Sequence, residues 1–169
     1  MITGRRRGVA LGCMAAAVLV VSGCGTGGPA EPTGDARADG VTVSVTLLPG
    51  PGSQRELLVT FRPLQPGFHI YSVDLPAQGV DGMGVPTRVT VRGGLTAVGK
   101  PSANRAIRLL QVTGLQSAIP VYPDGPVTFT MPVRRTGSHQ AEVIVSYAAC
   151  SEARCLMPVT GKAIRLDLG

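Results

Sequence analysis

The sequence has little aromatic or charged character. It has no tryptophan, three tyrosines and three phenylalanines, and only 15% of its 169 residues are charged. The formal net charge is +6, but there is no basic run beyond Arg7 and few aromatic residues accompany the scattered charges. A nucleic-acid interface uses clustered basic side chains. We therefore expect no nucleic-acid partner.

No stretch shows a helical period. The chain contains 23 glycines and 14 prolines, which would interrupt most helices. Short apolar segments with a period of two are separated by Gly and Pro, and this pattern is typical of strands. They lie at residues 41–47, 57–61, 68–73, 85–91, 95–98, 107–112, 127–133, 141–147 and 162–168. The pattern predicts one all-β domain with an immunoglobulin-like β-sandwich architecture.

Familiar cofactor and catalytic motifs are also missing. There is no glycine-rich phosphate loop, zinc-type spacing or nucleophile elbow. Gly79–Gly84 is rich in glycine, but no helical pattern follows it, so we interpret it as a turn. We expect no cofactor and no resident metal.

The first 23 residues are predicted to be a lipoprotein signal peptide. Arg5–Arg7 form a basic start, and the apolar run over residues 9–21 is short for a membrane-spanning helix. The run ends in Val21-Ser22-Gly23-Cys24, which looks like a bacterial lipobox, so Cys24 is the expected lipidation site. Two acyl chains suffice for stable attachment. The protein is thus expected to be extracytoplasmic and lipid-anchored to the bacterial membrane, the alternatives being an ordinary signal peptide or an uncleaved anchor.

Residues 24–40 are rich in Gly, Pro, Ala and Asp without an apolar period, and they predict a flexible tether. The folded domain is expected at residues 41–169. Loss of Arg5–Arg7 with the signal peptide would lower the net charge to +3.

Four cysteines are present, but only two belong to the predicted domain. Cys13 would leave with the signal peptide and Cys24 would carry lipid, which leaves Cys150 and Cys155 in an oxidising compartment. The strand before Cys150 and the turn and strand after Cys155 place these cysteines across a tight hairpin. Paired positions there meet disulfide geometry, which needs Cα atoms roughly 4.4–6.8 Å apart. We expect a Cys150–Cys155 bond.

So short a bridge adds little to stability. A cross-link around about six residues contributes roughly 2 kcal/mol in the chain-entropy model, and the hairpin already holds its own ends together. A bond that opens and closes explains the pair better, since exposed or strained disulfides exchange readily. An inert hairpin disulfide is the alternative.

Two segments resemble the N-terminal periplasmic domain of the thiol:disulfide interchange protein DsbD. Residues 66–72, PGFHIYS, resemble its aromatic strand. Tyr147 to Pro158, with the pattern Tyr-x-x-Cys-x4-Cys-x-x-Pro, resembles its redox hairpin, and residues 84–91 are compatible with the strand between them. The resemblance covers roughly residues 41–168 and implies an immunoglobulin-like fold.

The resemblance also implies a function. Such domains take electrons from a membrane reductant and pass them to oxidised exported proteins through mixed disulfides. Because this chain lacks the family's membrane and thioredoxin-like domains, the donor would be a separate, CcdA-like protein. The expected recipients are thioredoxin-like exported proteins, including those of cytochrome c biogenesis. The chain itself is expected to act as a monomeric oxidoreductase.

Roles for individual residues follow from the same resemblance. Cys155 is expected to be the nucleophile and Cys150 the resolving thiol, with Arg154 beside Cys155 favouring its thiolate. Tyr71 and His69 are expected to flank the disulfide.

The sequence departs from the family in two places. Four residues separate the cysteines where the family has five. The stretch corresponding to the family's cap loop, about residues 94–100, lacks acidic and aromatic residues, so Leu95 and Val98 are expected to form a hydrophobic lid.

Two other functions remain open at the level of sequence. Soft ligands could hold copper(I), namely Cys150, Cys155, Met157, His69 and Met83. The second alternative is a non-catalytic binding module with an inert disulfide.

Overall fold

The computed structural model describes residues 30–169 together with Met1. The predicted signal peptide and the lipidation site Cys24 lie outside this part of the chain. No helix is found among the described residues, and accordingly none of them forms an apolar helix able to cross a membrane.

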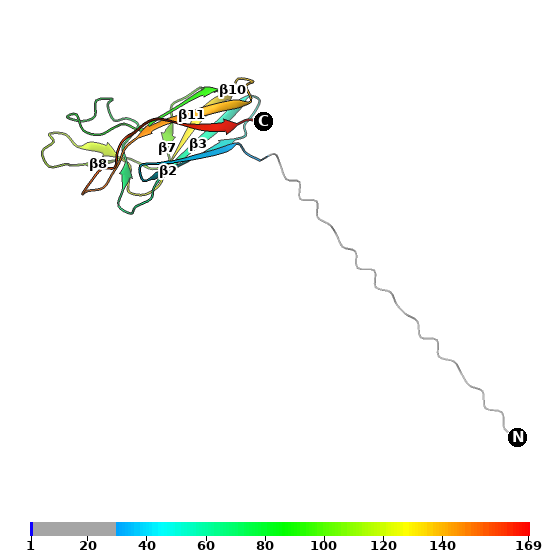
Figure 1. The fold of residues 1–169 in the computed structure, drawn as a ribbon, viewed down its shortest axis with the longest axis horizontal. Coiled ribbons are helices and arrows are strands. Elements are labelled where there is room, and N and C mark those ends of the chain that lie inside the picture. Colours follow the sequence, from blue (N-terminus) through cyan, green and yellow to red (C-terminus); the bar gives the residue numbers. More distant parts are fainter. Residues whose placement is uncertain (2–29) are drawn as a thin grey trace.

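Antiparallel strands form two packed sheets (Figure 1). The larger sheet contains β1 (Thr33–Ala38), β2 (Val41–Leu48), β3 (Gln54–Pro63), β10 (Val127–Arg135) and β6 (Leu95–Ala97), with β7 (Ser102–Ala103) also paired to β10. The smaller sheet contains β13 (Val159–Asp167), β11 (Gln140–Tyr147) and β5 (Arg88–Gly93). Two short ladders pair β12 (Ala149–Cys150) with β4 (His69–Ile70) and β8 (Arg108–Leu110) with β9 (Ile119–Val121). The predicted all-β, immunoglobulin-like sandwich is confirmed.

The core lies between the two sheets, because alternate residues of each strand face inward. Val41, Val43, Val45 and Leu47 of β2 are all buried, and β10 and β11 alternate in the same way. The Phe61 ring packs edge-on against two other aromatic rings, with centroids 5.5 Å from Phe129 and 5.2 Å from Tyr147. This packing joins β3 and β10 of the larger sheet to β11 of the smaller one.

The sandwich begins earlier than the sequence predicted. Residues 24–40 were expected to be a tether, but Thr33–Ala38 forms β1, which pairs along its whole length with β2. Asp39 and Gly40 connect the two strands with φ angles of 43° and 72°. Positive φ angles at both positions are typical of the two-residue hairpin turn that matches the right-handed twist of the strands. The Tyr147 hydroxyl donates a hydrogen bond to the Ala38 carbonyl at 3.1 Å and holds β1 to β11.

A bulge in β11 carries the chain from the smaller sheet to the cysteines. The register between β11 and β13 shifts between Val145 and Tyr147, and the Ser146 hydroxyl accepts a hydrogen bond from the Gly161 N–H at 2.9 Å. Bulges of this kind bend a strand and often lie beside functional sites. Beyond the bulge, Ala149–Cys150 pairs with β4 instead of β5.

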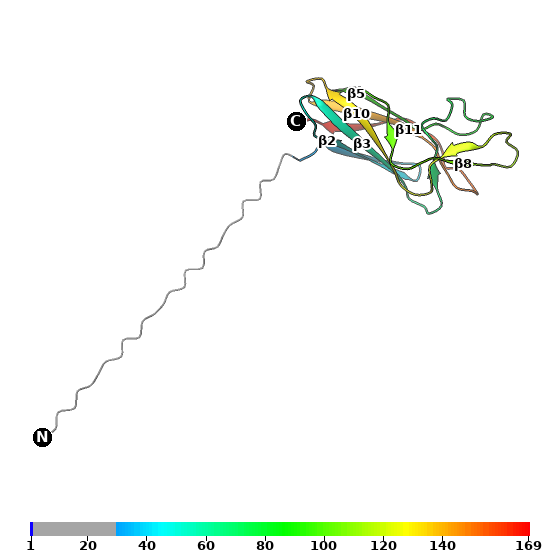
Figure 2. The same ribbon diagram turned by 180° about the vertical axis from the view of Figure 1, so that it is seen from behind.

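The two ends of the sandwich differ. The C-terminus and the beginning of the described chain lie together at one end, whereas β8 and the loops around it lie at the other, as both views show (Figures 1 and 2). The cysteine hairpin lies at the β8 end. Its strand β12, which contains Cys150, pairs with β4, and Tyr71 just after β4 pairs with Val121 of β9, the partner of β8.

Candidate functional site

The site is built around the segment Phe68–Ser72, which lies between two other stretches of chain. On one side Ile70 and His69 pair with Ala149 and Cys150. On the other side the Tyr122 N–H donates to the Ile70 carbonyl and the Gly125 N–H to the Phe68 carbonyl, both at 2.9 Å. The segment is thus fixed from both edges, and all five of its residues are buried.

The expected disulfide is present. Cys150 and Cys155 are bonded, with their Cα atoms 4.0 Å apart across an antiparallel bridge. Backbone hydrogen bonds close the hairpin on both sides of the bond, from Ser151 N to Arg154 O and from Leu156 N to Ala149 O. The Ser151 hydroxyl also accepts from the N–H groups of Ala153 and Arg154. These hydrogen bonds support the hairpin in addition to the disulfide.

The two cysteines differ in exposure. Cys150 is 3% exposed, on the β12 ladder, whereas Cys155 is solvent-exposed at the end of the turn. An attacking thiolate must approach the sulfur it bonds to. Of this pair, Cys155 is the cysteine that a second protein can reach.

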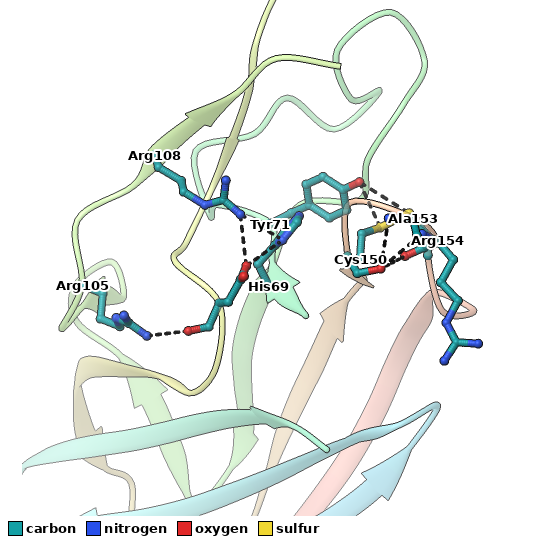
Figure 3. A network of polar contacts seen from close by, with 10 residues as sticks. His69, Tyr71, Arg105, Arg108, Cys150, Ala153 and Arg154 are labelled. Atoms are coloured by element: carbon teal, nitrogen blue, oxygen red, sulfur yellow. Dashed lines mark hydrogen bonds and ion pairs between the residues drawn. A yellow bond between two sulfur atoms is a disulfide. The ribbon is translucent and has the colours of Figure 1, made fainter. Parts of the chain in front are cut away.

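Tyr71 contacts the disulfide directly (Figure 3). Its hydroxyl oxygen lies 3.1 Å from Cys150 Sγ and 3.9 Å from Cys155 Sγ. A disulfide sulfur carries no proton, so the hydroxyl is the donor. Burial raises the pKa of Tyr71, which keeps the hydroxyl protonated as a donor.

His69 lies next to Tyr71 and is fully buried, in a polar group that the sequence did not suggest. Its Nδ1 lies 3.2 Å from Asp124 Oδ1, and the same carboxylate oxygen accepts from Arg108 at 3.0 Å. Asp124 reaches His69 because it follows Tyr122 along the stretch that pairs with Phe68–Ser72. No signal in the sequence links these residues, since 55 positions separate His69 from Asp124.

His69 Nε2 is buried without a hydrogen-bond partner. Burial lowers the pKa of His69, and the Asp124 hydrogen bond offsets part of this effect. Nearby charges act in both directions, since Arg108 lowers the pKa while Asp124 and Glu152 raise it.

Arg154 adjoins Cys155 in sequence, but its guanidinium is engaged elsewhere. It donates to the Gln65 side-chain carbonyl and lies over the Phe68 ring, 5.7 Å from the centroid. Figure 3 shows the side chain directed away from the sulfurs. In the oxidised form Arg154 thus anchors the hairpin to the Phe68 segment, and its effect on the Cys155 thiolate stays a prediction.

The predicted lid of Leu95 and Val98 is wrong. β6, which begins with Leu95, pairs with Val133–Arg135 at the end of the sandwich away from the cysteines. Gly93, just before β6, is opposite Ala141, and about 20 Å of β11 separates Ala141 from Tyr147 at roughly 3.3 Å per residue. Leu95 is a core residue that is 2% exposed.

Other residues cover the buried side of the disulfide. Tyr71 and Cys150 belong to a second apolar cluster with Leu75, Ile119 and Val121, and residues of the loops around Val80 and Leu115 pack against it. Gly84 lies so close to Tyr71 that an added Cβ would be 3.2 Å from the ring. These loops fix the ring that contacts the sulfurs.

The side chains predicted as alternative copper(I) ligands do not form a common site in the oxidised form. The two sulfurs are bonded to each other, His69 contacts Asp124, and Met157 is 73% exposed. Within residues 30–169 and Met1, no group of three or more His, Cys, Asp or Glu side chains is placed to hold a metal ion.

A cavity of about 680 Å³ lies at the opposite end of the sandwich. Its lining includes Ala30, where the described chain resumes, and the C-terminal Gly169. None of the residues predicted for the site lines it, so the chemistry and this cavity are separate.

Comparison with solved structures gives a likeness in fold. The crystal structure of the N-terminal periplasmic domain of ScsB from Proteus mirabilis matches with a TM-score of 0.58 and 16% identity, over 82% of this chain and 52% of that chain. This chain therefore spans about half the length of that structure. The DsbD N-terminal domain of Neisseria meningitidis, in its reduced form, matches with a TM-score of 0.38 and 13% identity, over 81% of this chain and 89% of that one.

The GAE domain of GGA2p from Saccharomyces cerevisiae matches at a TM-score of 0.36 and 12% identity, over 79% of this chain and 98% of that one. Of these three structures, the ScsB domain is the one similar enough to support the fold assignment. Comparison with models of known protein families finds no match, and comparison with curated proteins finds none either.

Proposed function

We propose that this protein is an extracytoplasmic thiol:disulfide exchange protein that relays electrons through the Cys150–Cys155 pair. The observation that carries the proposal is the unequal exposure of the two bonded cysteines. Cys155 is open to a second protein, while Cys150 is buried beneath the hydroxyl of Tyr71. A purely structural disulfide requires no such difference in exposure, and backbone hydrogen bonds also hold this hairpin together.

The exchange begins with reduction of the pair. A donor thiolate attacks Cys155 Sγ, the bond between Cys155 and Cys150 breaks, and the electron pair goes to Cys150 Sγ, which accepts a hydrogen bond from Tyr71 and then a proton. A second donor thiolate attacks the donor sulfur of the mixed disulfide and releases Cys155 as a thiolate. The donor is oxidised to a disulfide, and the pair is reduced to the Cys150 thiol and the Cys155 thiolate.

Delivery of the electrons runs through the same sulfur. The Cys155 thiolate attacks an oxidised recipient and forms a mixed disulfide. Cys150 then loses its proton and attacks Cys155 Sγ, which releases the reduced recipient and restores the pair.

The ScsB domain of similar fold is a periplasmic domain, which supports an extracytoplasmic location for this chain. We extend the proposal to a lipoprotein anchored through Cys24, with a CcdA-like membrane protein as donor and thioredoxin-like exported proteins as recipients. Support comes from the lipobox-like segment and from the resemblance of the redox hairpin.

A trapping experiment tests the proposal. Cys150→Ser should leave the domain folded and accumulate a mixed disulfide between Cys155 and its partner, whereas Cys155→Ser should trap none. The control is the double variant, and the readout is a thiol-sensitive band shift on a non-reducing gel with the partner identified by mass spectrometry. Trapping only with Cys155→Ser would reverse the assignment of the two cysteines.

A redox titration separates exchange from an inert bond. The oxidised protein, carrying Cys13→Ser and Cys24→Ser, is equilibrated with glutathione or dithiothreitol buffers while free thiols are counted. A potential far below about −300 mV marks a structural disulfide and contradicts the proposal.

A further inference from the structure

One buried polar atom of the site is left without a hydrogen bond. His69 Nε2 is fully buried and has no partner, although buried nitrogens in proteins are almost always hydrogen-bonded. Leaving such a group unpaired destabilises the folded protein. The cost is explained if the atom acquires a partner in another state of the molecule.

The contacts of His69 assign its tautomer. Nδ1 lies 3.2 Å from Asp124 Oδ1, and an ionised carboxylate can only accept hydrogen bonds. Arg108, which can only donate, lies 3.4 Å from the same nitrogen, but its shorter contact at 3.0 Å is with the Asp124 carboxylate, so the Asp124 contact decides the tautomer. The proton of the neutral ring therefore resides on Nδ1, and Nε2 carries a lone pair. Arg108 pairs with the same carboxylate and holds it at the ring. A His held by a carboxylate in this way is oriented as a base.

The strand register places this base beside Cys150. His69 and Cys150 are directly opposite each other in the β4–β12 ladder, and side chains of paired residues lie on the same face with Cβ atoms roughly 4.5–5.5 Å apart. Tyr71, two residues further along, lies on this face too and contacts Cys150 Sγ. His69, Tyr71 and Cys150 therefore form one buried group (Figure 3).

In the disulfide, Cys150 has no proton to donate. Reduction converts its sulfur to a thiol, and this S–H lies on the same face of the β4–β12 ladder as the His69 ring with its unpartnered Nε2. The buried thiol also needs a base, because burial disfavours the thiolate that must attack Cys155 Sγ.

We propose that His69, oriented by Asp124, is the general base that takes the proton from the Cys150 thiol when Cys150 closes the disulfide. The inference rests on the proposed exchange function and deepens it. The proton moves from Cys150 Sγ to His69 Nε2, the sulfur–sulfur bond between Cys150 and Cys155 forms, the bond from Cys155 to the partner sulfur breaks, and the partner leaves as a thiolate. The imidazolium then loses its proton to solvent, and Asp124 stabilises it meanwhile.

Other charged groups face His69 from the elements around it. Arg108 of β8 opposes protonation of the ring, whereas Asp124 and Glu152, which lies in the hairpin turn, favour it. Burial, the largest effect, lowers the pKa of His69 and keeps the ring neutral and able to accept a proton at neutral pH.

The closing step can be timed with Ellman's reagent. The chain used is the full-length one with Cys13→Ser and Cys24→Ser, kept in mild detergent and reduced with a phosphine that is then removed. Attack by Cys155 releases a first equivalent of thionitrobenzoate, and closure by Cys150 releases a second. Cys150→Ser must abolish the second phase, which assigns it.

His69→Gln should slow the second phase at least tenfold at pH 7 and leave the first phase within about twofold, given the contribution that a positioned base makes to proton transfer. In the parent chain the second-phase rate should fall as the pH drops through the His69 pKa and level off above it. In the variant it should instead rise steadily with pH. Equal second-phase rates and unchanged pH profiles would overturn the assignment.

A second variant avoids changing a buried side chain. Asp124 has a side chain that is 48% exposed, and Asp124→Asn should slow the second phase several-fold. The matched control is Arg105→Gln, because Arg105 contacts only the backbone carbonyls of Asp124 and Pro126. If Asp124→Asn and this control have equal second-phase rates, the proposed role of Asp124 is overturned.

NMR provides a test without substitution of the site. The chain has two histidines, His69 and His139, so its imidazole ¹⁵N spectrum has an internal reference at the exposed His139. In the oxidised protein His69 Nε2 should be unprotonated, and its signal should shift on reduction while that of His139 does not. A protonated Nε2, or a signal indifferent to reduction, refutes the proposal.

These outcomes separate the two levels of inference. If the parent chain releases no second equivalent, the exchange function fails. If it does so at a rate independent of His69 and Asp124, the exchange function stands and only the role of His69 fails.

Discussion

At the scale of the residue, the hydroxyl of Tyr71 contacts the disulfide, 3.1 Å from Cys150 Sγ. It stabilises negative charge on Cys150 Sγ when the bond opens, and hydrogen bonds to charged groups contribute about 1.5–3 kcal/mol. Tyr71→Phe keeps the ring and should slow reduction by dithiothreitol about tenfold, as followed by alkylation of free thiols. Tyr122→Phe is the control, since that buried hydroxyl contacts the Val73 N–H at 3.5 Å and no sulfur. Equal rates for the two variants would show that the Tyr71 contact has no effect.

The lowered pKa of His69 also predicts how the free energy of unfolding depends on pH. Its pKa is lowered in the folded state, so the unfolded chain binds a proton first as the pH falls below about 6.5. The free energy of unfolding should therefore be greatest above this pH and decrease as the pH falls towards the lowered pKa of the folded state. Urea unfolding of the oxidised protein at pH 7.5 and 5.5 measures the effect, and His69→Gln should show a smaller difference. A pH dependence unchanged by the substitution would assign the effect to other groups.

The sequence indicates Cys150, Cys155 and Tyr71 because each lies in a short motif. It does not indicate Asp124 or Arg108, because their proximity to His69 arises from pairing between stretches far apart in the chain. Nor does it reveal the direction of the Arg154 side chain, which depends on where Gln65 and Phe68 lie in the fold.

At the scale of the element, β1 is a polar segment that nevertheless forms a strand, and its neighbours explain why. Its sequence, TGDARA, has low β-propensity, but β2 supplies a complete backbone partner and Asp39-Gly40 supplies the turn. The Asp-Gly pair was the available signal, since it is a strong hairpin turn sequence. The other side of β1 packs close to β13, where a Cβ at Gly34 would lie 2.6 Å from the Arg165 carbonyl oxygen.

Gly34→Val should therefore force β1 away from β13 and cost about 1–3 kcal/mol, the usual range for overpacking. The matched control is Asp35→Val, which adds the same side chain on the exposed face of the same strand. Urea unfolding gives the stabilities, and hydrogen exchange of the β1 amide groups locates the change. Equal midpoints for the two variants would mean that β1 tolerates displacement.

Strand positions were predicted well where inward and outward residues alternate, as in β2, β10 and β11. The pairing of strands was not predicted, and this explains why Leu95 and Val98 were wrongly expected to form a lid over the disulfide. A stretch of the right length and apolar character was assigned to the wrong end of the sandwich, because the register of β6 with β10 is set by long-range contacts.

At the scale of the whole molecule, the cysteine hairpin and the C-terminus lie at opposite ends of the sandwich (Figures 1 and 2). A folded protein fused after Gly169 should leave both phases of the Ellman reaction, and exchange with a protein disulfide, within about twofold of the parent. The same protein inserted at Gly114, in the loop between β8 and β9, should hinder the protein substrate while the small reagent still reacts. Loss of both reactions in the C-terminal fusion would contradict this geometry.

The exposure of one cysteine and the burial of the other have a kinetic consequence. In the proposed exchange, donor and recipient take turns at a single docking position, because each would form its covalent link with the same atom of Cys155. Turnover should therefore follow a ping-pong scheme, in which a large excess of either protein occupies the position and slows the other. Under this proposal the chain is covalently linked to one partner at a time, and electrons pass through it as successive pairs without a three-protein covalent intermediate.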